Sequence, residues 1–369
     1  MITISIRRAV AAAAICMLTV ILSVGCSLTH TPDTPPFSGN VILVIGDGMG
    51  FAHVGAASRF FTGEDDGLSF QQFPVQNQMT TNSLSGVTDS AAAATAMATG
   101  YKVFNGVIST LLCGEPETVL EYYQRFGKRT GLVTTTYITH ATPAAFGAHS
   151  SNRGNLADIA GDYLHGSRPN VLLGGGGNGM TVSSAEEAGY TVVTDRDSLY
   201  AINASVELHV SGQFGTSHLP YVLDGYGILP TLPDMTQVAL DILDEDPDGF
   251  FLMVEAGRID HASHGNDLGK MVREVGSLAD TIDTILAWAG SREDTIIVVT
   301  ADHETGNLSD DIPITAGVLP AADQQDQYWG STSHTNTAVP LYAWGLSSEL
   351  FSGSILDNTD IYHILVNNF

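Results

Sequence analysis

Six runs of β-branched and other apolar residues recur along the chain, each bounded by glycine, proline or polar residues. The first covers residues 41–45 and is followed by Gly46, Asp47 and Gly48. A continuous apolar run of this length is typical of a strand that is buried on both faces. We therefore predict a strand that presents Asp47 at its carboxyl end. The other runs lie at 131–136, 170–173, 250–255, 295–301 and 339–344.

Segments with a helical pattern alternate with these runs. They lie near residues 88–99, 117–126, 155–165, 235–244 and 267–288. Alternation of this kind predicts an α/β fold, with a mostly parallel central β-sheet sandwiched between helices. In contrast, residues 174–233 and 306–332 show little periodicity, and we expect surface loops there. The glycines at 174–177 lack the Lys and Ser/Thr of a phosphate-binding loop.

Residues that could bind a metal ion follow four of the predicted strands. Ligands of an α/β sheet bind outside the carboxyl ends of its strands, so these side chains are expected to share one site. Four purely structural strands would rarely all end in this way. The residues, in chain order, are Asp47, His140, Thr142, Glu255, Asp260, His261, His264, Asp302 and His303.

A candidate nucleophile lies at the start of the alanine-rich segment 88–99. Thr88 or Asp89 can cap a helix here, and Gly100 stands where a helix commonly ends. Ser90 would then occupy the first turn, where free backbone N–H groups favour an oxyanion or a phosphoryl group. Considered alone, the segment fits a buried structural helix with an incidental cap better than a nucleophile's setting.

Histidines and carboxylates supply the donor atoms of a zinc site. Asp260 and His264 are four residues apart, as paired ligands on one helical turn would be. Together with Asp302, His303 and His334 they provide three imidazoles and several carboxylates, which suit zinc with an open position. The oxygen donors of a second set, Asp47, Thr142 and Glu255, suit magnesium.

Taken together and in order, these fragments resemble the motifs of the alkaline phosphatases. The resemblance covers roughly residues 40–345 and rests on residue identity, spacing and order. The matching fragments are Gly46-Asp47-Gly48, Thr88-Asp89-Ser90-Ala91, Thr139-His140-Ala141-Thr142-Pro143, Asn152-Arg153, Glu255 through His264, Thr300-Ala301-Asp302-His303 and Ser333-His334.

The resemblance implies two zinc ions and one magnesium ion per chain. It assigns the first zinc to Asp260, His264 and His334, the second to Asp47, Asp302 and His303, and magnesium to Asp47, Thr142 and Glu255. Histidine stands at 140 and 261, as in animal members, where other relatives have an acidic residue and a lysine. The third ion is therefore magnesium or zinc.

The implied reaction is hydrolysis of phosphate monoesters with broad specificity at alkaline pH. Ser90 would form a phosphoserine intermediate and Arg153 would hold the phosphate, with His140, His261 and Asp89 close by. Alternatives are a phosphodiesterase of the same superfamily or a catalytically silent metal- or phosphate-binding lipoprotein. Sulfatases use a modified Cys or Ser followed by Pro and Arg, which the sequence after Ser90 lacks.

Composition and the amino terminus indicate where the protein acts. The 369 residues include 40 acidic and 14 basic side chains, a net charge of −26, which argues against nucleic acid as a partner. Residues 1–26 fit a secretory signal, either a plain one or a lipoprotein signal with Cys26 lipidated. Residues 27–39 then form a tether, and 40–369 a single catalytic domain. We expect an exported protein, periplasmic or an outer-membrane or cell-surface lipoprotein.

The resemblance also bears on assembly. Dimers are common in the family, so a homodimer is expected. Only thirty residues separate His303 from His334, whereas relatives with a large crown insert have far more sequence there. A large crown is therefore not expected.

Overall fold

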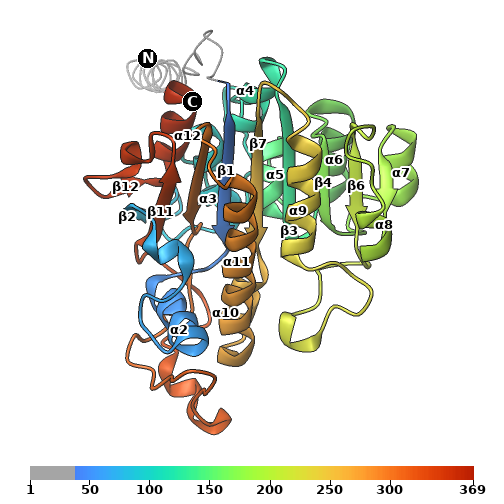
Figure 1. Cartoon of the computed structure of the whole chain (residues 1–369). Helices are drawn as coiled ribbons and strands as arrows, with labels where there is room; N and C mark the ends of the chain where they lie inside the picture. Colours follow the sequence, from blue (N-terminus) through green and yellow to red (C-terminus); the bar gives the residue numbers. More distant parts are fainter. Residues whose placement is uncertain (1–37) are drawn as a thin grey trace, which may run out of the picture.

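A ten-stranded sheet runs through the centre of the molecule in the computed structural model, which describes residues 38–369 (Figure 1). Neighbouring strands are parallel, except that β11 runs antiparallel to both β2 and β8. In order across the sheet, the strands are β12 (Leu356–Asp357), β2 (Val75–Thr80), β11 (Val339–Gly345), β8 (Thr295–Thr300), β1 (Asn40–Gly46), β7 (Phe250–Ala256), β3 (Arg129–Tyr137), β4 (Val171–Gly175), β6 (Val210–Gln213) and β5 (Thr191–Val193).

Helices cover both faces of this sheet, as Figure 1 shows. On the near face lie α9 (Leu232–Leu243) and α11 (Leu268–Ala289), with α2 (Phe51–Thr62) packed against α11. On the far face lie α3 (Ser90–Thr99), α4 (Val119–Arg125), α5 (Ala141–Gly147) and α12 (Asn358–Asn368). The sandwich architecture expected from the sequence is confirmed.

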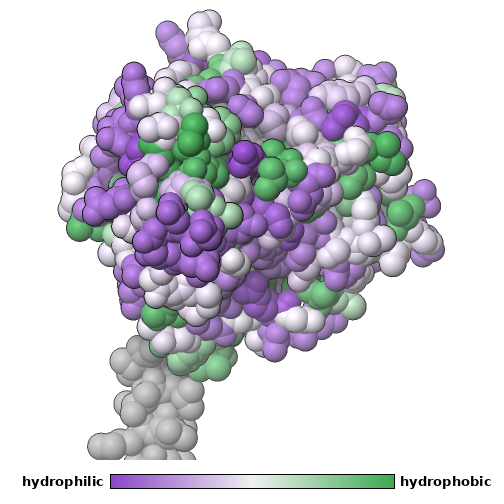
Figure 2. Space-filling view, turned by 90° about the horizontal axis from the view of Figure 1, so that it is seen from below, coloured by the Kyte–Doolittle hydropathy of each residue, from purple (hydrophilic) through white to green (hydrophobic). Residues whose placement is uncertain are grey.

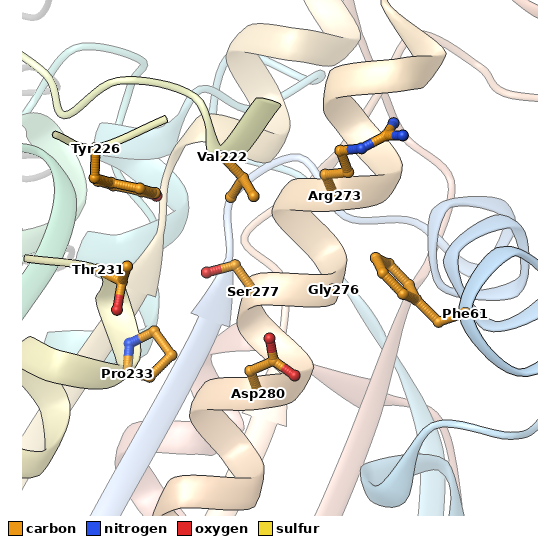
Figure 3. Close-up of a pocket in the computed structure, with 9 residues that line it drawn as sticks. All are labelled: Phe61, Val222, Tyr226, Thr231, Pro233, Arg273, Gly276, Ser277 and Asp280. Carbon is orange, nitrogen blue, oxygen red and sulfur yellow. The ribbon is translucent and has the colours of Figure 1, made fainter. Parts of the chain in front are cut away.

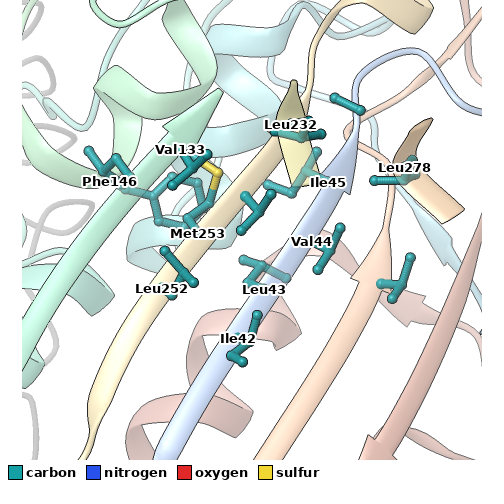
Figure 4. Packing of buried hydrophobic residues seen from close by; sticks show 14 of the residues in the cluster. Ile42, Leu43, Val44, Ile45, Val133, Phe146, Leu232, Leu252, Met253 and Leu278 are labelled. Carbon is teal, nitrogen blue, oxygen red and sulfur yellow. The ribbon is translucent and has the colours of Figure 1, made fainter. Parts of the chain in front are cut away.

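The core forms on both sides of the central strands. All seven residues of β1 are buried, because helices cover both of its faces. Figure 4 shows Val133 and Phe146 on one side of the group and Leu232 and Leu278 on the other. Burial of each such side chain contributes about 1.5–3 kcal/mol, so the core holds the strand ends firmly in place.

Helix α3 is buried along its whole length, including Ser90 at its first position. Asp89 caps it, with its carboxylate accepting from the Ala92 N–H at 3.0 Å. Gly100 ends the helix with φ +75°, and a Cβ at this position would lie 2.8 Å from the side chains of Tyr362 and His363. The short side chains between these ends let α3 pack directly against α5 and α12.

The six predicted strands are confirmed, but the expectation of surface loops over residues 174–233 is wrong. It contains β6 and β5, which extend the sheet at one edge, and the short helices α7 (Val182–Glu187) and α8 (Arg196–Tyr200). These strands have only three or four residues and few apolar neighbours, so their pattern is weak. The segment between His303 and His334 contains short helical turns and the start of a two-stranded ribbon of β9 (Glu304–Thr305) with β10 (His334–Thr335).

The expected signal, Cys26 and nearly all of the expected tether lie outside the described residues. Within residues 38–369, no helix is both long and apolar enough to cross a membrane. Seen from below, the surface is largely hydrophilic, with apolar side chains in separate small groups (Figure 2).

Candidate metal centre and nucleophile

Three adjacent central strands deliver carboxylates to the same edge of the sheet. In the register of β1, Ile45 lies opposite Glu255 of β7 and Thr300 of β8. Asp47 directly follows β1, and Asp302 lies two residues after the end of β8. All three carboxylates are completely buried. The parallel arrangement of β8, β1 and β7 therefore brings acidic groups from distant parts of the chain together.

The first group of donor atoms comprises Asp260, His264 and His334. The first two lie one turn apart on α10 (Arg258–His264), and the third begins β10. The two Nε2 atoms are 3.1 Å apart, and the Asp260 Oδ1 atom lies 3.3 Å and 3.6 Å from them. A tetrahedral zinc ion with bonds of about 2.0–2.1 Å requires ligand atoms about 3.4 Å apart. The group has this geometry.

Both imidazoles of this group turn their Nε2 lone pairs inward. The Nδ1 atom of His264 donates to the Thr332 carbonyl at 2.6 Å, and that of His334 donates to the Thr88 carbonyl at 2.8 Å. A carbonyl can only accept, so each ring carries its proton on Nδ1. The opposite nitrogen is then free to bind a metal, as is usual for histidine ligands with such partners.

The second group comprises Asp47, Asp302 and His303, and Ser90 adjoins it. The Nε2 atom of His303 lies 3.5 Å from Asp47 Oδ1, 3.2 Å from Asp302 Oδ2 and 3.5 Å from the Ser90 hydroxyl. Gly48, with φ +76°, donates its N–H to the other Asp302 oxygen at 3.0 Å. The group therefore presents three ligand atoms and one hydroxyl to a common point.

The third group comprises Asp47, His140 and Glu255. One Glu255 oxygen, Oε2, accepts from the hydroxyls of Thr134 and Thr136, the latter at 3.2 Å. The other, Oε1, is buried without a partner, as is the hydroxyl of Thr142. Oxygen donors with unused lone pairs fit a magnesium ion, while the imidazole of His140 also suits zinc.

Unbalanced negative charge shows that these groups fit divalent cations. Burial, followed by the repulsion of Asp302 and other carboxylates, holds the pKa of Asp47 well above its usual range. Burial likewise raises the pKa of Asp302 to about 8. Both Asp47 oxygens and one Asp302 oxygen are buried without a hydrogen-bond partner. Buried carboxylates are normally paired or bound to metal, so the donor set suits cations at this point.

Asp260 differs from the other carboxylates. Burial raises its pKa, but contact with the His264 imidazole and the nearby His303 and His334 rings outweigh burial and lower the pKa. The Thr305 hydroxyl also donates to its Oδ1 at 2.6 Å. Asp260 is thus held as an anion beside two imidazoles.

Arg153 connects the nucleophile's helix to the third group. Its NH1 donates to Asp89 Oδ2 at 3.0 Å, and its NH2 donates to His140 Nε2 at 3.3 Å. The Gly106 N–H donates to the same Asp89 oxygen at 3.0 Å, and the Arg153 N–H donates to the Gly106 carbonyl at 2.7 Å. The guanidinium is only half-buried, so its N–H groups can donate to a bound oxyanion.

The site brings the predicted residues together and adds others that the sequence did not reveal. Thr134, Thr136 and Thr305 hold carboxylates by their hydroxyls. His218 reaches the site from the loop after β6, with its ring 4.5 Å from that of His261. His261 in turn lies 5.9 Å from the His140 ring. No local motif marks a threonine or a loop histidine for such a role.

A separate pocket of 340 Å³ lies beside α11, away from the donor groups (Figure 3). Arg273, Ser277 and Asp280 line it from the helix, Val222 and Tyr226 from one side and Phe61 from the other. None of the candidate ligands lines it. Its walls mix apolar and oppositely charged side chains and indicate no particular ligand.

Comparisons with known proteins find alkaline phosphatases in both sequence and structure. Residues 38–311 match the sequence profile of the alkaline phosphatases. Alkaline phosphatase 3 of Bacillus subtilis (strain 168) is 35% identical, with 87% of each chain covered. The crystal structure of a cold-active alkaline phosphatase from a psychrophilic Shewanella sp. is 30% identical and superposes with a TM-score of 0.78, covering 89% of this chain and 98% of the other. A mutant of the TAB5 alkaline phosphatase with Mg bound in its M3 site is 27% identical, with a TM-score of 0.75 and coverage of 90% and 98%.

Proposed function

Because the chain belongs to the alkaline phosphatase family, we propose that it hydrolyses phosphate monoesters with broad specificity at alkaline pH through a phosphoserine formed on Ser90. The observation that carries this proposal is the position of the Ser90 hydroxyl, 3.5 Å from His303 Nε2 at the meeting point of the second donor group. A serine needs activation to attack phosphorus, and a metal site at its hydroxyl supplies a means.

Three ions would occupy the donor groups. Asp260, His264 and His334 would hold one zinc, and Asp47, Asp302 and His303 the other. Asp47, Thr142 and Glu255 would hold magnesium, or zinc if His140 joins them. When bound, such ions act as Lewis acids that stabilise negative charge on the attacking and leaving oxygens of a phosphoryl transfer.

The chain's own residues define the two chemical steps. The Ser90 oxygen forms a bond to phosphorus as the bond to the ester oxygen breaks, and the alcohol leaves after taking up a proton. The phosphoserine lies at the amino end of α3, where free N–H groups favour its charge. Water then attacks phosphorus, releases inorganic phosphate and restores the Ser90 hydroxyl.

Arg153 binds and orients the transferred group. Its two terminal nitrogens match two phosphate oxygens in a bidentate contact. Asp89 and Gly106 hold the residue in place before substrate arrives. His140 and His261 complete the wall of the site, next to the phosphate and the third ion.

The test is a comparison of substrate classes. Hydrolysis of an aryl phosphate monoester, a phosphodiester and a sulfate ester is measured at pH 8–10, before and after chelation, with zinc and magnesium restored separately and together. The proposal expects monoester activity that chelator removes and both ions restore. Preferential cleavage of the diester or sulfate ester would overturn the substrate class, and absence of all three activities would favour a silent binding protein.

We also propose that the protein is exported and tethered through Cys26, with residues 40–369 forming one catalytic domain that assembles as a homodimer. The tether rests on the small residues before Cys26 and the proline-rich segment after it. Incorporation of labelled fatty acid into the full chain, but not into a Cys26→Ser variant, would support lipidation. Release of both forms from the cell envelope without label would contradict it, and light scattering would give the subunit number.

A further inference from the structure

The Nδ1 atoms of the histidines around the site face partners of opposite kinds. His264 and His334 each donate from Nδ1 to a backbone carbonyl, which leaves Nε2 as a free acceptor. His261 lies one residue from Asp260 on the same helix, but its Nδ1 is 2.8 Å from the NH1 group of Arg258. A guanidinium only donates, so this nitrogen must accept. The neutral His261 ring then carries its proton on Nε2.

Contacts among three parts of the chain hold the Arg258 side chain in this position. Its guanidinium carbon lies 3.8 Å from the centre of the Tyr221 ring, and the Lys270 ammonium lies 4.5 Å from the same ring. Val222, which follows Tyr221 in the sequence, donates its backbone N–H to the Glu274 carboxylate at 2.8 Å. Glu274 lies on α11 and is almost completely buried. These contacts join α10, the loop after β6 and α11.

The His261 ring is confined on its other sides as well. His218 packs at 4.5 Å with an interplanar angle of 71°, and His140 lies at 5.9 Å. The Tyr137 ring supports His218 at 4.7 Å. Rotation of His261 away from Arg258 would break its charge-assisted hydrogen bond and these ring contacts together.

We propose that Arg258 is a positioning residue that holds His261 in the tautomer with the proton on Nε2, so that His261 serves the site as a hydrogen-bond donor and binds no metal. This inference rests on the proposed function, because it concerns the same site. A donor near His140, which Arg153 contacts, would strengthen the binding of an oxyanion.

The tautomer of His261 can be measured directly by NMR. Nitrogen-15 NMR of the full-length protein loaded with zinc and magnesium gives the protonated nitrogen of each histidine, and His261→Gln identifies the signals of His261. The proposal expects wild-type His261 to be protonated on Nε2, and zinc content to stay unchanged in His261→Gln. A proton on Nδ1, or loss of zinc in that variant, would overturn it.

Substitution of Arg258 tests the positioning role. Arg258→Met should redistribute the His261 proton between the two nitrogens and weaken the binding of inorganic phosphate about tenfold, with metal content unchanged. Arg258→Lys, which keeps a donor, should restore most of both. Arg273→Met removes a cation that stacks on Phe60 from α11 and should change neither. An unaltered tautomer in Arg258→Met would contradict the role.

Failure of the proposed function would look different. A protein that cleaves no phosphate monoester could still show His261 protonated on Nε2 and sensitive to Arg258. The wild-type spectrum needs no substitution, so the tautomer assignment stays testable even if Arg258→Met fails to fold.

Discussion

The Ser90 hydroxyl lies 3.5 Å from the Nε2 atom of His303, although 213 residues separate them in the sequence. Ser90 opens helix α3 on one face of the sheet, while His303 follows the central strand β8. The separation matches the distance of about 3.4 Å between two ligands of one tetrahedral ion. This relationship places the hydroxyl at the second donor group, as the proposed metal-activated nucleophile requires.

Replacement of Ser90 should separate chemistry from metal binding. In Ser90→Ala we expect turnover of a phosphate monoester to fall at least about a thousandfold, because the group that attacks phosphorus is lost. The six donor atoms of the first and second groups remain, so we expect zinc content to stay the same. Steady-state kinetics and metal analysis check both parts. Near-normal turnover would exclude Ser90 as the nucleophile.

Replacement of His334 should lower zinc content and activity together. His334→Ala leaves the first group with only Asp260 and His264, so zinc content should drop by about one ion per chain and activity should fall with it. His165→Ala provides a control, since His165 is exposed on the surface. Zinc content is measured by mass spectrometry of the acid-digested protein. Equal zinc in both variants would show that His334 is not a ligand.

Arg153 and Asp89 should act as a unit on phosphate binding. In Arg153→Ala we expect kcat/KM to fall about tenfold to a hundredfold, because a bidentate charge-assisted contact is lost. Asp89→Asn should have a smaller effect, since it only weakens the support of the guanidinium. The double variant should be little worse than Arg153→Ala alone. Additive losses would mean that the two residues act independently, and Arg168→Ala controls for loss of a surface cation.

The partly buried pair of His149 and Glu121 should make stability depend on pH. Burial opposes the charge on His149, but the hydrogen bond and charge of Glu121 outweigh it and raise the pKa of His149 from 6.5 to about 9. A raised pKa stabilises the fold fully below about pH 6.5, and this contribution disappears as the pH rises through 9. The shift corresponds to about 3 kcal/mol at most.

The measurement is the free energy of unfolding of wild type and His149→Gln between pH 6 and pH 10. We expect the difference between them to be largest at pH 6 and to shrink steadily toward pH 10. A difference that stays constant over this range would show that packing, and not the ionised pair, accounts for the contribution of His149.

Much of the arrangement of candidate donor groups could be predicted because these residues follow strong local patterns. The apolar run of β1 ends at Asp47, and Asp260 and His264 have the spacing of one helical turn, which the structure realises in α10. Asp89 and Gly100 stand at the two ends of α3 as their chemistry favours. In each case the signal lies within a few residues of the group that it places.

The parts that could not be predicted depend on contacts between distant segments. Strands β6 and β5 carry little apolar pattern. Pairing of β6 with β4, and of β5 with β6, places them in the sheet. The threonines beside Glu255 and the loop histidine His218 acquire their positions only when β3, β7 and the loop after β6 come together. Arg258 reaches His261 within α10, but Tyr221 from another segment holds it there.

The most direct test of the account is to trap the enzyme during turnover. Protein mixed with a phosphate monoester is quenched in acid, digested and analysed by peptide mass spectrometry, with Ser90→Ala treated in parallel. The account predicts one phosphoryl group on the peptide that contains Ser90, and none in the variant. Turnover with no phosphorylated peptide, or with phosphate on another residue, would contradict it.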